Sequence, residues 1–245
     1  MIDINNKKFN FYDPIKLIEK EKRIESFFSD IIFTLSEKYI PDREKEKVRN
    51  QFGNLIMNYA NQNPGFQNIY SSFESIISEK IIIKLENKTN TNRSTSLISN
   101  FILIDINNNK NFKYIEKNLK GILDKRIIPI ISHPERFTVF DKENIKNLKE
   151  KGVLFQLSLG SFSSFFGENS KSKSLEYLES GIYDFIASDS INYDQINDEF
   201  LEKQINNILK IIGSNKLNEL IFSNPKNVID EKLSNDFQLL NAKGS

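Results

Sequence analysis

The sequence of 245 residues contains no cysteine, no tryptophan and only one histidine. The absence of cysteine excludes disulfides, thiolate-bound zinc, iron–sulfur clusters and a thiol nucleophile. A single imidazole also excludes a histidine-rich zinc site. Any metal bound by this chain must therefore be held mainly by oxygen ligands.

The sequence also lacks an excess of charge and long apolar runs. Lys and Arg total 34 against 33 Asp and Glu, a net charge of +1 that does not indicate a nucleic-acid partner. Apolar runs such as Phe101–Ile104 are too short to cross a bilayer, so we expect no membrane insertion. The first residues lack the apolar segment of a secretory signal, which favours a cytoplasmic protein. Its oligomeric state is not indicated.

Short β-branched segments alternate with longer amphipathic stretches, a pattern typical of repeated β–α units. A first helix is expected to begin at Asp13-Pro14. Four glycines are expected to end later helices. The polar region Ile83–Asn100 is expected to be a mobile loop. The pattern predicts one α/β domain over residues 1–245, and about seven such units favour an α/β barrel. The expected strands are Ile2–Ile4, Asp30–Leu35, Asn68–Phe73, Phe101–Ile106, Ile127–Ser132, Val153–Leu159 and Asp184–Ser188, and the helix-ending glycines are Gly121, Gly152, Gly181 and Gly213.

Polar side chains follow most of these strands. In an α/β barrel the chemistry lies where the strands end, because the loops there converge on the barrel axis. Convergent carboxylates with one imidazole would form a ligand set for Mn²⁺ or Mg²⁺. The alternative is that these acids cap the following helices or bind loop amides. The residues concerned are Asn5, Lys7, Glu37, Glu74, Asp105, His133 and Asp189.

The fifth expected strand leads directly into His133, and Arg136 follows three residues later. An imidazole and a guanidinium on one turn suit recognition of a phosphate or a metal-bound phosphate. Pro134 fixes the turn between them. The alternative is a capped turn in which Glu135 or another nearby acid pairs with Arg136.

Three motifs in this order resemble the bacterial protein-tyrosine phosphatases of the polymerase-and-histidinol-phosphatase (PHP) class, which are associated with capsule and exopolysaccharide synthesis. They are His133–Phe137, Phe155–Gly167 and Asp184–Asp189, and the match includes Ile221–Pro225. The resemblance implies a distorted (β/α)7 barrel with a cluster of usually three divalent metals. It also implies a substrate, the phosphorylated tail of a bacterial tyrosine kinase.

The same resemblance assigns roles to residues of this chain. It implies Glu74, Asp105, His133 and Asp189 as metal ligands, and His133 and Arg136 as catalytic residues. Other family positions differ. The opening His-x-His motif of the family reads Asn5-Asn6-Lys7, a later histidine aligns with Glu37, and the family's Asp-x-His motif reads Asp189-Ser190-Ile191. The arginine expected within residues 192–199 is absent.

Because so many ligands are replaced, three metals are not expected to bind. The leading interpretation is a weak or inactive family member with a binding or regulatory role toward a phosphotyrosine-bearing kinase tail. It would carry no cofactor, or weakly bound Mn²⁺ or Mg²⁺. Lys7 either neutralises Glu74 and Asp189 in place of a metal or points into solvent.

Two other interpretations stay open. One is an active Mn²⁺- or Mg²⁺-dependent phosphatase whose one or two ions are held by carboxylates, Glu37 included, together with His133. The other is a structural partner in a polysaccharide-export assembly, which exposed phenylalanines at Phe162, Phe165 and Phe166 would favour over ordinary loop packing.

Overall fold

The computed structural model describes residues 2–4, 31–36, 40–41, 43–62, 69–86, 97–98, 100–107, 109–189 and 198–229. The expected first helix at Asp13-Pro14 lies outside these residues, as do Asn5, Lys7 and Glu37. None of the described helices combines the length and apolar character needed to span a bilayer.

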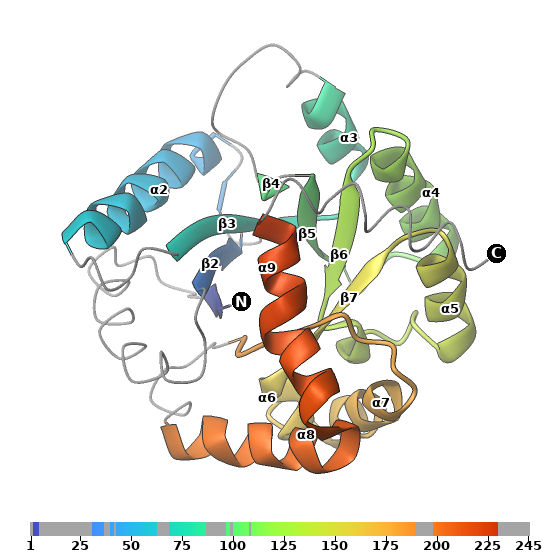
Figure 1. Cartoon of the computed structure of the whole chain (residues 1–245). Helices are drawn as coiled ribbons and strands as arrows, with labels where there is room; N and C mark the ends of the chain where they lie inside the picture. The colour runs from blue at the N-terminus through green and yellow to red at the C-terminus, as the bar shows by residue number, and fades with distance from the viewer. Residues whose placement is uncertain are drawn as a thin grey trace.

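One sheet forms the centre of the molecule (Figure 1). Seven of its strands pair in parallel in the order in which they occur along the chain. All seven expected strands are confirmed, with ends that differ by up to three residues. They are β1 (Ile2–Ile4), β2 (Ile31–Ser36), β3 (Ile69–Ile76), β5 (Phe101–Asp105), β6 (Ile128–Ser132), β7 (Leu154–Ser158) and β8 (Phe185–Ala187).

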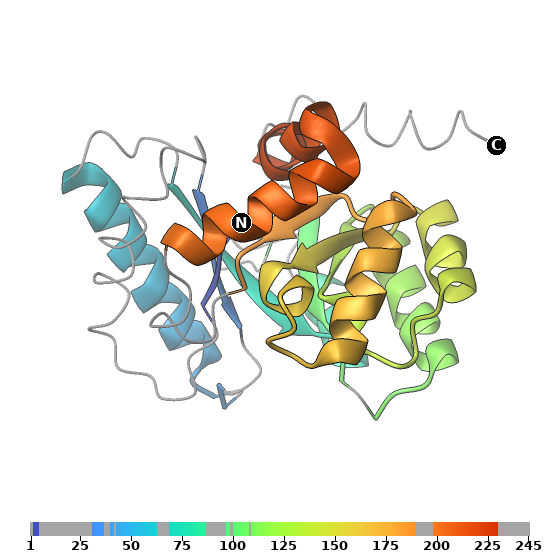
Figure 2. The same cartoon turned by 90° about the horizontal axis from the view of Figure 1, so that it is seen from below.

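Helices cover the outside of this sheet, and Figure 2 shows the same layers from below. Consecutive parallel strands need such crossovers, so the α/β class is confirmed. No described strand pair joins β8 to β1, which fits a distorted rather than a regular barrel. The helices are α2 (Lys45–Gln62), α3 (Glu79–Glu86), α4 (Phe112–Leu123), α5 (Lys142–Glu150), α6 (Leu159–Phe162), α7 (Glu168–Glu179), α8 (Asp198–Asn218) and α9 (Asn224–Ile229), with the short helical turns η3 (Pro134–Arg136) and η4 (Glu219–Ser223).

Local sequence signals explain several helix ends. Asn111 and Asp141 cap α4 and α5 by accepting hydrogen bonds from the backbone at Tyr114 (2.9 Å) and Asn144 (2.7 Å). Gly152 and Gly181 follow α5 and α7 with φ values of 91° and 66°, a region that glycine enters without steric cost.

Of the other two expected helix ends, one differs in the structure and one is confirmed. Gly121 lies inside α4, which continues to Leu123. Gly213 does end a helical stretch, because its φ of 75° interrupts the helical backbone within α8 and a second helical stretch follows it. Glycine permits a helix end without requiring one, and at Gly121 it leaves room for Ile82, whose Cδ1 would lie 2.5 Å from an added Cβ.

The expectation of a loop over the whole of Ile83–Asn100 is wrong at both ends. Helix α3 continues to Glu86, and Leu97–Ile98 form β4, which pairs antiparallel with β5. Helix α3 buries Ile81 and Leu85, one turn apart, against the core. This apolar spacing extends the helix into a region whose overall composition is polar.

Strands β5, β6, β7 and β8 are buried on both faces, as expected when helices cover a sheet. Alternate residues of β5 pack into different clusters: Ile102 and Ile104 pack with the outer helices, whereas Phe101 and Leu103 pack with the inner residues of neighbouring strands. Because alternate residues of a strand face the same side, Asp105 in β5 and Ser132 in β6 lie on this inner face too. The inner face therefore changes from apolar to polar toward the carboxyl ends of the strands.

Gly160 in α6 allows close packing beside these strand ends. A Cβ atom at this position would lie 2.8 Å from Cε2 of the Phe166 ring. We therefore predict that Gly160→Ala lowers the free energy of unfolding by about 1–3 kcal/mol, because a rigid ring must move. Urea unfolding followed by circular dichroism measures this change.

Gly53 in α2 provides the matched control, because a Cβ there meets no atom within 4 Å. Gly53→Ala should raise the free energy of unfolding by up to about 1 kcal/mol, since alanine favours a helix. Equal effects of the two substitutions would contradict the packing explanation for Gly160.

Candidate metal and phosphate site

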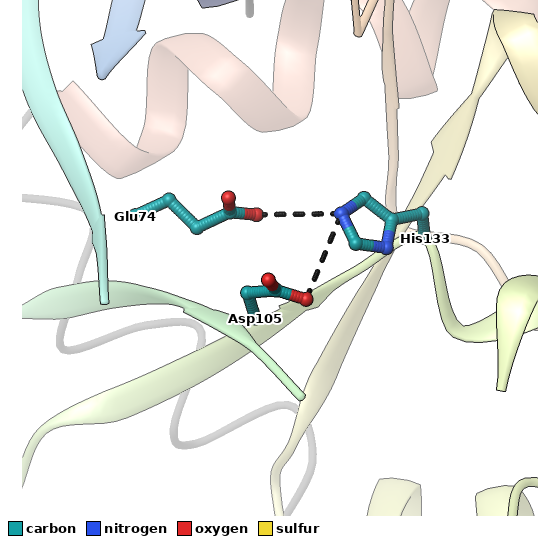
Figure 3. Close-up of side chains that lie close together, drawn as sticks. All are labelled: Glu74, Asp105 and His133. Carbon is teal, nitrogen blue, oxygen red and sulfur yellow. Dashed lines mark ion pairs between the residues drawn. The ribbon is translucent and has the colours of Figure 1, made fainter. Parts of the chain in front are cut away.

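Three buried side chains converge at the carboxyl ends of the central strands (Figure 3). Glu74 lies in β3, Asp105 ends β5, and His133 directly follows β6. The Nε2 atom of His133 lies 3.5 Å from Oε1 of Glu74 and 3.9 Å from Oδ1 of Asp105. Their exposed fractions are 0%, 2% and 4%, so this group is largely shielded from solvent.

The backbone at His133 adopts an unusual conformation that presents its side chain to the acids. Its φ of 37° lies in the left-handed region, which is uncommon for residues other than glycine. Its amide donates to the carbonyl of Gln156 (3.0 Å), and its carbonyl accepts from the amide of Arg136 (3.1 Å). Pro134 then begins η3. These contacts fix the turn on which His133 and Arg136 are carried.

Ser132 connects Glu74 to the strand that carries His133. Its hydroxyl hydrogen-bonds to Oε1 of Glu74 and also lies 3.1 Å from the carbonyl of Ile104. One hydroxyl hydrogen serves only one acceptor at a time. When the hydroxyl donates to Glu74, it positions the carboxylate oxygen that lies 3.5 Å from the imidazole.

Arg136, on the same turn, contacts a different set of residues from His133. Its side chain is 13% exposed and forms an ion pair with the fully buried carboxylate of Asp189. Its Nη2 and Nε atoms donate to the hydroxyls of Ser158 (2.5 Å) and Ser161 (2.9 Å). The guanidinium carbon lies 3.3 Å from the centroid of the Phe166 ring. An acid does pair with Arg136, but it comes from beyond β8 rather than from the turn.

Glu135 serves a different purpose, which the sequence did not reveal. It is 1% exposed and accepts hydrogen bonds from the Tyr183 hydroxyl (3.0 Å) and the Ser158 amide (3.3 Å). Burial, reinforced by the Glu135 carboxylate, raises the pKa of Tyr183 well above its ordinary value of 10.0. Glu135 thus ties η3 to the end of β7 and to the residue preceding Asp184. The only sequence signal for this role of Glu135 was its position as an acidic residue in the turn after an expected strand.

The donor set of Glu74, Asp105 and His133 fits one divalent cation. Two ligands of one small divalent ion, each at about 2.1 Å, lie at most about 4.2 Å apart. The separations of 3.5 Å and 3.9 Å from the imidazole satisfy this limit. Two buried carboxylates also repel each other unless a positive charge lies between them.

The structure brings together Glu74, Asp105 and His133, three of the four expected metal ligands. Within the described residues Asp189 is not part of this group and instead contacts Arg136. Its role as a metal ligand stays a prediction. Asn5, Lys7 and Glu37 lie outside the described residues, so the expectations for them stay predictions too.

Of the three phenylalanines beyond β7, two are accounted for by packing. Phe162 is 8% exposed in the core, and Phe166 packs against Arg136. Phe165 is 46% exposed, and its ring lies 6.0 Å from that of Phe200. One exposed ring does not make the apolar patch that a purely structural partner would need.

Residues 12–230 match the sequence profile of the family described as capsular polysaccharide synthesis, CpsB/CapC. The chain belongs to this family. It is 28% identical over 244 residues to a protein named CapC from Staphylococcus aureus, covering 96% of this chain and 90% of that protein. The expected resemblance to capsule-associated tyrosine phosphatases is thereby confirmed.

Two further relatives match shorter regions. The tyrosine-protein phosphatase CpsB from Streptococcus pneumoniae is 28% identical over 142 residues, which are 55% of this chain and 58% of CpsB. The tyrosine-protein phosphatase YwqE from Bacillus subtilis (strain 168) is 35% identical over 95 residues, which are 38% of this chain and 37% of YwqE.

The fold is shared with a solved structure from a study of YwqE and CpsB, which calls those proteins unique metal-dependent tyrosine phosphatases. The match has a TM-score of 0.69 and 21% sequence identity, and it covers 87% of this chain and 86% of the other. This CpsB/CapC-family chain therefore has the expected PHP-type fold.

The hydrogen bond between Tyr183 and Glu135 should stabilise the turn that carries the site. We predict that Tyr183→Phe lowers the free energy of unfolding by about 1–3 kcal/mol at about pH 8, because a buried carboxylate loses a donor. The raised pKa adds a pH dependence. Tyr183 stabilises the fold below the unfolded pKa of about 10, and this contribution is lost as pH rises above that value.

Urea unfolding at about pH 8 and about pH 11 measures both effects, and the variant should lose less stability than the wild type over this interval. Tyr114→Phe on α4 is the control, since the contact of the ring with Lys110 does not need the hydroxyl. If the Tyr183 and Tyr114 variants behave alike, the proposed contribution of the Glu135 contact is wrong.

Proposed function

We propose that this CpsB/CapC-family chain binds one divalent cation, Mn²⁺ or Mg²⁺, through Glu74, Asp105 and His133. The convergence of three buried ligand atoms from three strand ends carries this proposal. Mixed carboxylate and imidazole ligands suit these ions. A bound ion of this kind would polarise a phosphoryl oxygen and lower the pKa of a bound water.

We further propose that hydrolysis is weak or lost and that the chain acts mainly by binding. The sequence contains one histidine, so imidazoles cannot supply a cluster of three ions. Positions that carry histidines in the resembled phosphatases read Asn5, Lys7 and Ile191. Fewer ligands leave a weaker site with less stabilisation of charge on the phosphoryl group.

The proposed partner is a phosphotyrosine-bearing segment of a bacterial tyrosine kinase. CpsB and YwqE are named tyrosine-protein phosphatases, which supports phosphotyrosine as the ligand chemistry. Arg136 is the proposed phosphate contact, because a guanidinium binds a phosphoryl group through two parallel hydrogen bonds. The family match over residues 12–230 supports a single domain for residues 1–245.

An active phosphatase is the second candidate function. The two buried carboxylates of Glu74 and Asp105 favour it, because carboxylates can replace imidazoles around Mn²⁺ or Mg²⁺. His133 would then serve as a ligand close to the reacting phosphate, and Arg136 would hold that phosphate. The two candidates differ in the rate of hydrolysis, which is directly measurable.

The cation site predicts a defined stoichiometry. Isothermal titration of chelator-treated protein with MnCl₂ should show about one ion per chain, and His133→Ala should weaken its affinity at least about tenfold. Asp105→Asn should weaken the Mn²⁺ affinity in the same way, and it tests the site independently if the histidine variant does not fold. Asp124→Asn, an exposed acid after α4, is the control and should bind Mn²⁺ like the wild type.

Absence of Mn²⁺ binding, or binding that neither substitution weakens, would overturn the cation site. The three side chains would then form a hydrogen-bonded imidazole–carboxylate cluster that supports the fold only. Circular dichroism of each variant establishes that the comparison is made between folded proteins.

The proposed loss of activity is tested with phenyl phosphate and a phosphotyrosine peptide. With Mn²⁺ present, we expect the wild type to hydrolyse both no faster than His133→Ala does. Turnover that requires Mn²⁺ and disappears in His133→Ala would instead establish the active phosphatase. Stoichiometric Mn²⁺ binding without turnover would support the binding role.

A further inference from the structure

The environment of Arg136 has the chemistry of an oxyanion site. Its guanidinium lies between two serine hydroxyls and a buried carboxylate, Asp189. In the described hydrogen bonds with Arg136 both serine oxygens are acceptors, so each hydroxyl keeps a hydrogen that it can donate. Guanidinium and hydroxyl donors that point to one position are the groups that bind phosphate.

We propose that Asp189 fills this site as an internal anion, so that a phosphate monoester binds Arg136 only after the carboxylate is displaced. This inference deepens the phosphate-binding part of the proposed function and rests on it. It does not involve the cation site. Asp189 is therefore a residue that controls affinity for the ligand.

The arginine is held in place by more than Asp189. The Phe166 ring stacks against the guanidinium at 3.3 Å, and Gly160 leaves room for this ring. Ser158 is itself fixed, because its hydroxyl oxygen accepts from the Ser161 amide (3.2 Å). We therefore expect the donors to keep their positions when the Asp189 charge is removed.

Charge balance explains why the internal anion competes well. The Asp189 side chain has an exposed fraction of 0%, whereas that of Arg136 is 13%. A buried guanidinium that loses its carboxylate is strongly destabilised, and an external anion relieves this cost. An intramolecular partner also acts at an effective concentration on the order of millimolar or higher, against which free phosphate must compete.

The backbone at Asp189 permits a clean substitution. Its φ of 50° lies in the left-handed region, which asparagine and glycine both tolerate. Asp189→Asn removes the charge and keeps the shape of the side chain. Asp189→Gly removes the side chain altogether and suits the same backbone conformation.

Isothermal titration with inorganic phosphate and with O-phosphotyrosine, in the presence of EDTA, tests the proposal without any contribution from metal. We expect both Asp189 variants to bind each ligand at least about tenfold more tightly than the wild type. The double substitution Arg136→Gln with Asp189→Asn should abolish this gain. Asp141→Asn is the matched control, because it removes an exposed charge while asparagine still caps α5.

The proposal would be overturned by unchanged affinity in a folded Asp189 variant, by a gain that persists without Arg136, or by a failure of both variants to fold. The last would make Asp189 an indispensable structural counter-ion rather than a displaceable one. A gain for phosphate but not for O-phosphotyrosine would overturn the monoester as the ligand. Because EDTA is present throughout, failure of the cation site and failure of this proposal are separate results.

Discussion

Charge neutralisation of buried acids is the constraint on which the rest of this site depends. Glu74, Asp105 and Asp189 are all buried at the carboxyl ends of the strands, where ionised groups are costly unless a positive charge is close. The turn after β6 brings His133 to the first two acids and Arg136 to the third. One short turn therefore carries the two side chains that contact three buried acids from other strands.

The turn is held from outside as well as by its own sequence. Pro134 sets its first backbone angle, and Glu135 binds the Tyr183 hydroxyl and the Ser158 amide. Tyr183 precedes β8, and Ser158 ends β7. The position of the turn is consequently tied to the two strands that deliver Ser158 and Asp189 to Arg136. Glu135 thus links the turn that carries Arg136 to the segments around β7 and β8.

The sequence predicted the parts of this structure that depend on local pattern. Short β-branched segments located all seven parallel strands, and the polar residues at their ends located Glu74, Asp105 and His133. Contacts between distant strands were not predictable. The pairing of Arg136 with Asp189 depends on where two strand ends meet, and that of Glu135 with Tyr183 depends on how the turn is oriented. No local spacing encodes either distance.

The two proposals for this chain concern buried acids that one turn serves. The sequence supplies a single histidine, so only one imidazole is available to the acids at the strand ends. Arg136 is the cation that the structure places against Asp189, and once it is engaged there its donors are turned to a carboxylate of the chain. The cation site uses His133 of this turn and the phosphate contact uses Arg136, so the two proposals rest on different residues of one segment. While Asp189 occupies the arginine, a phosphate monoester must displace that carboxylate before it binds.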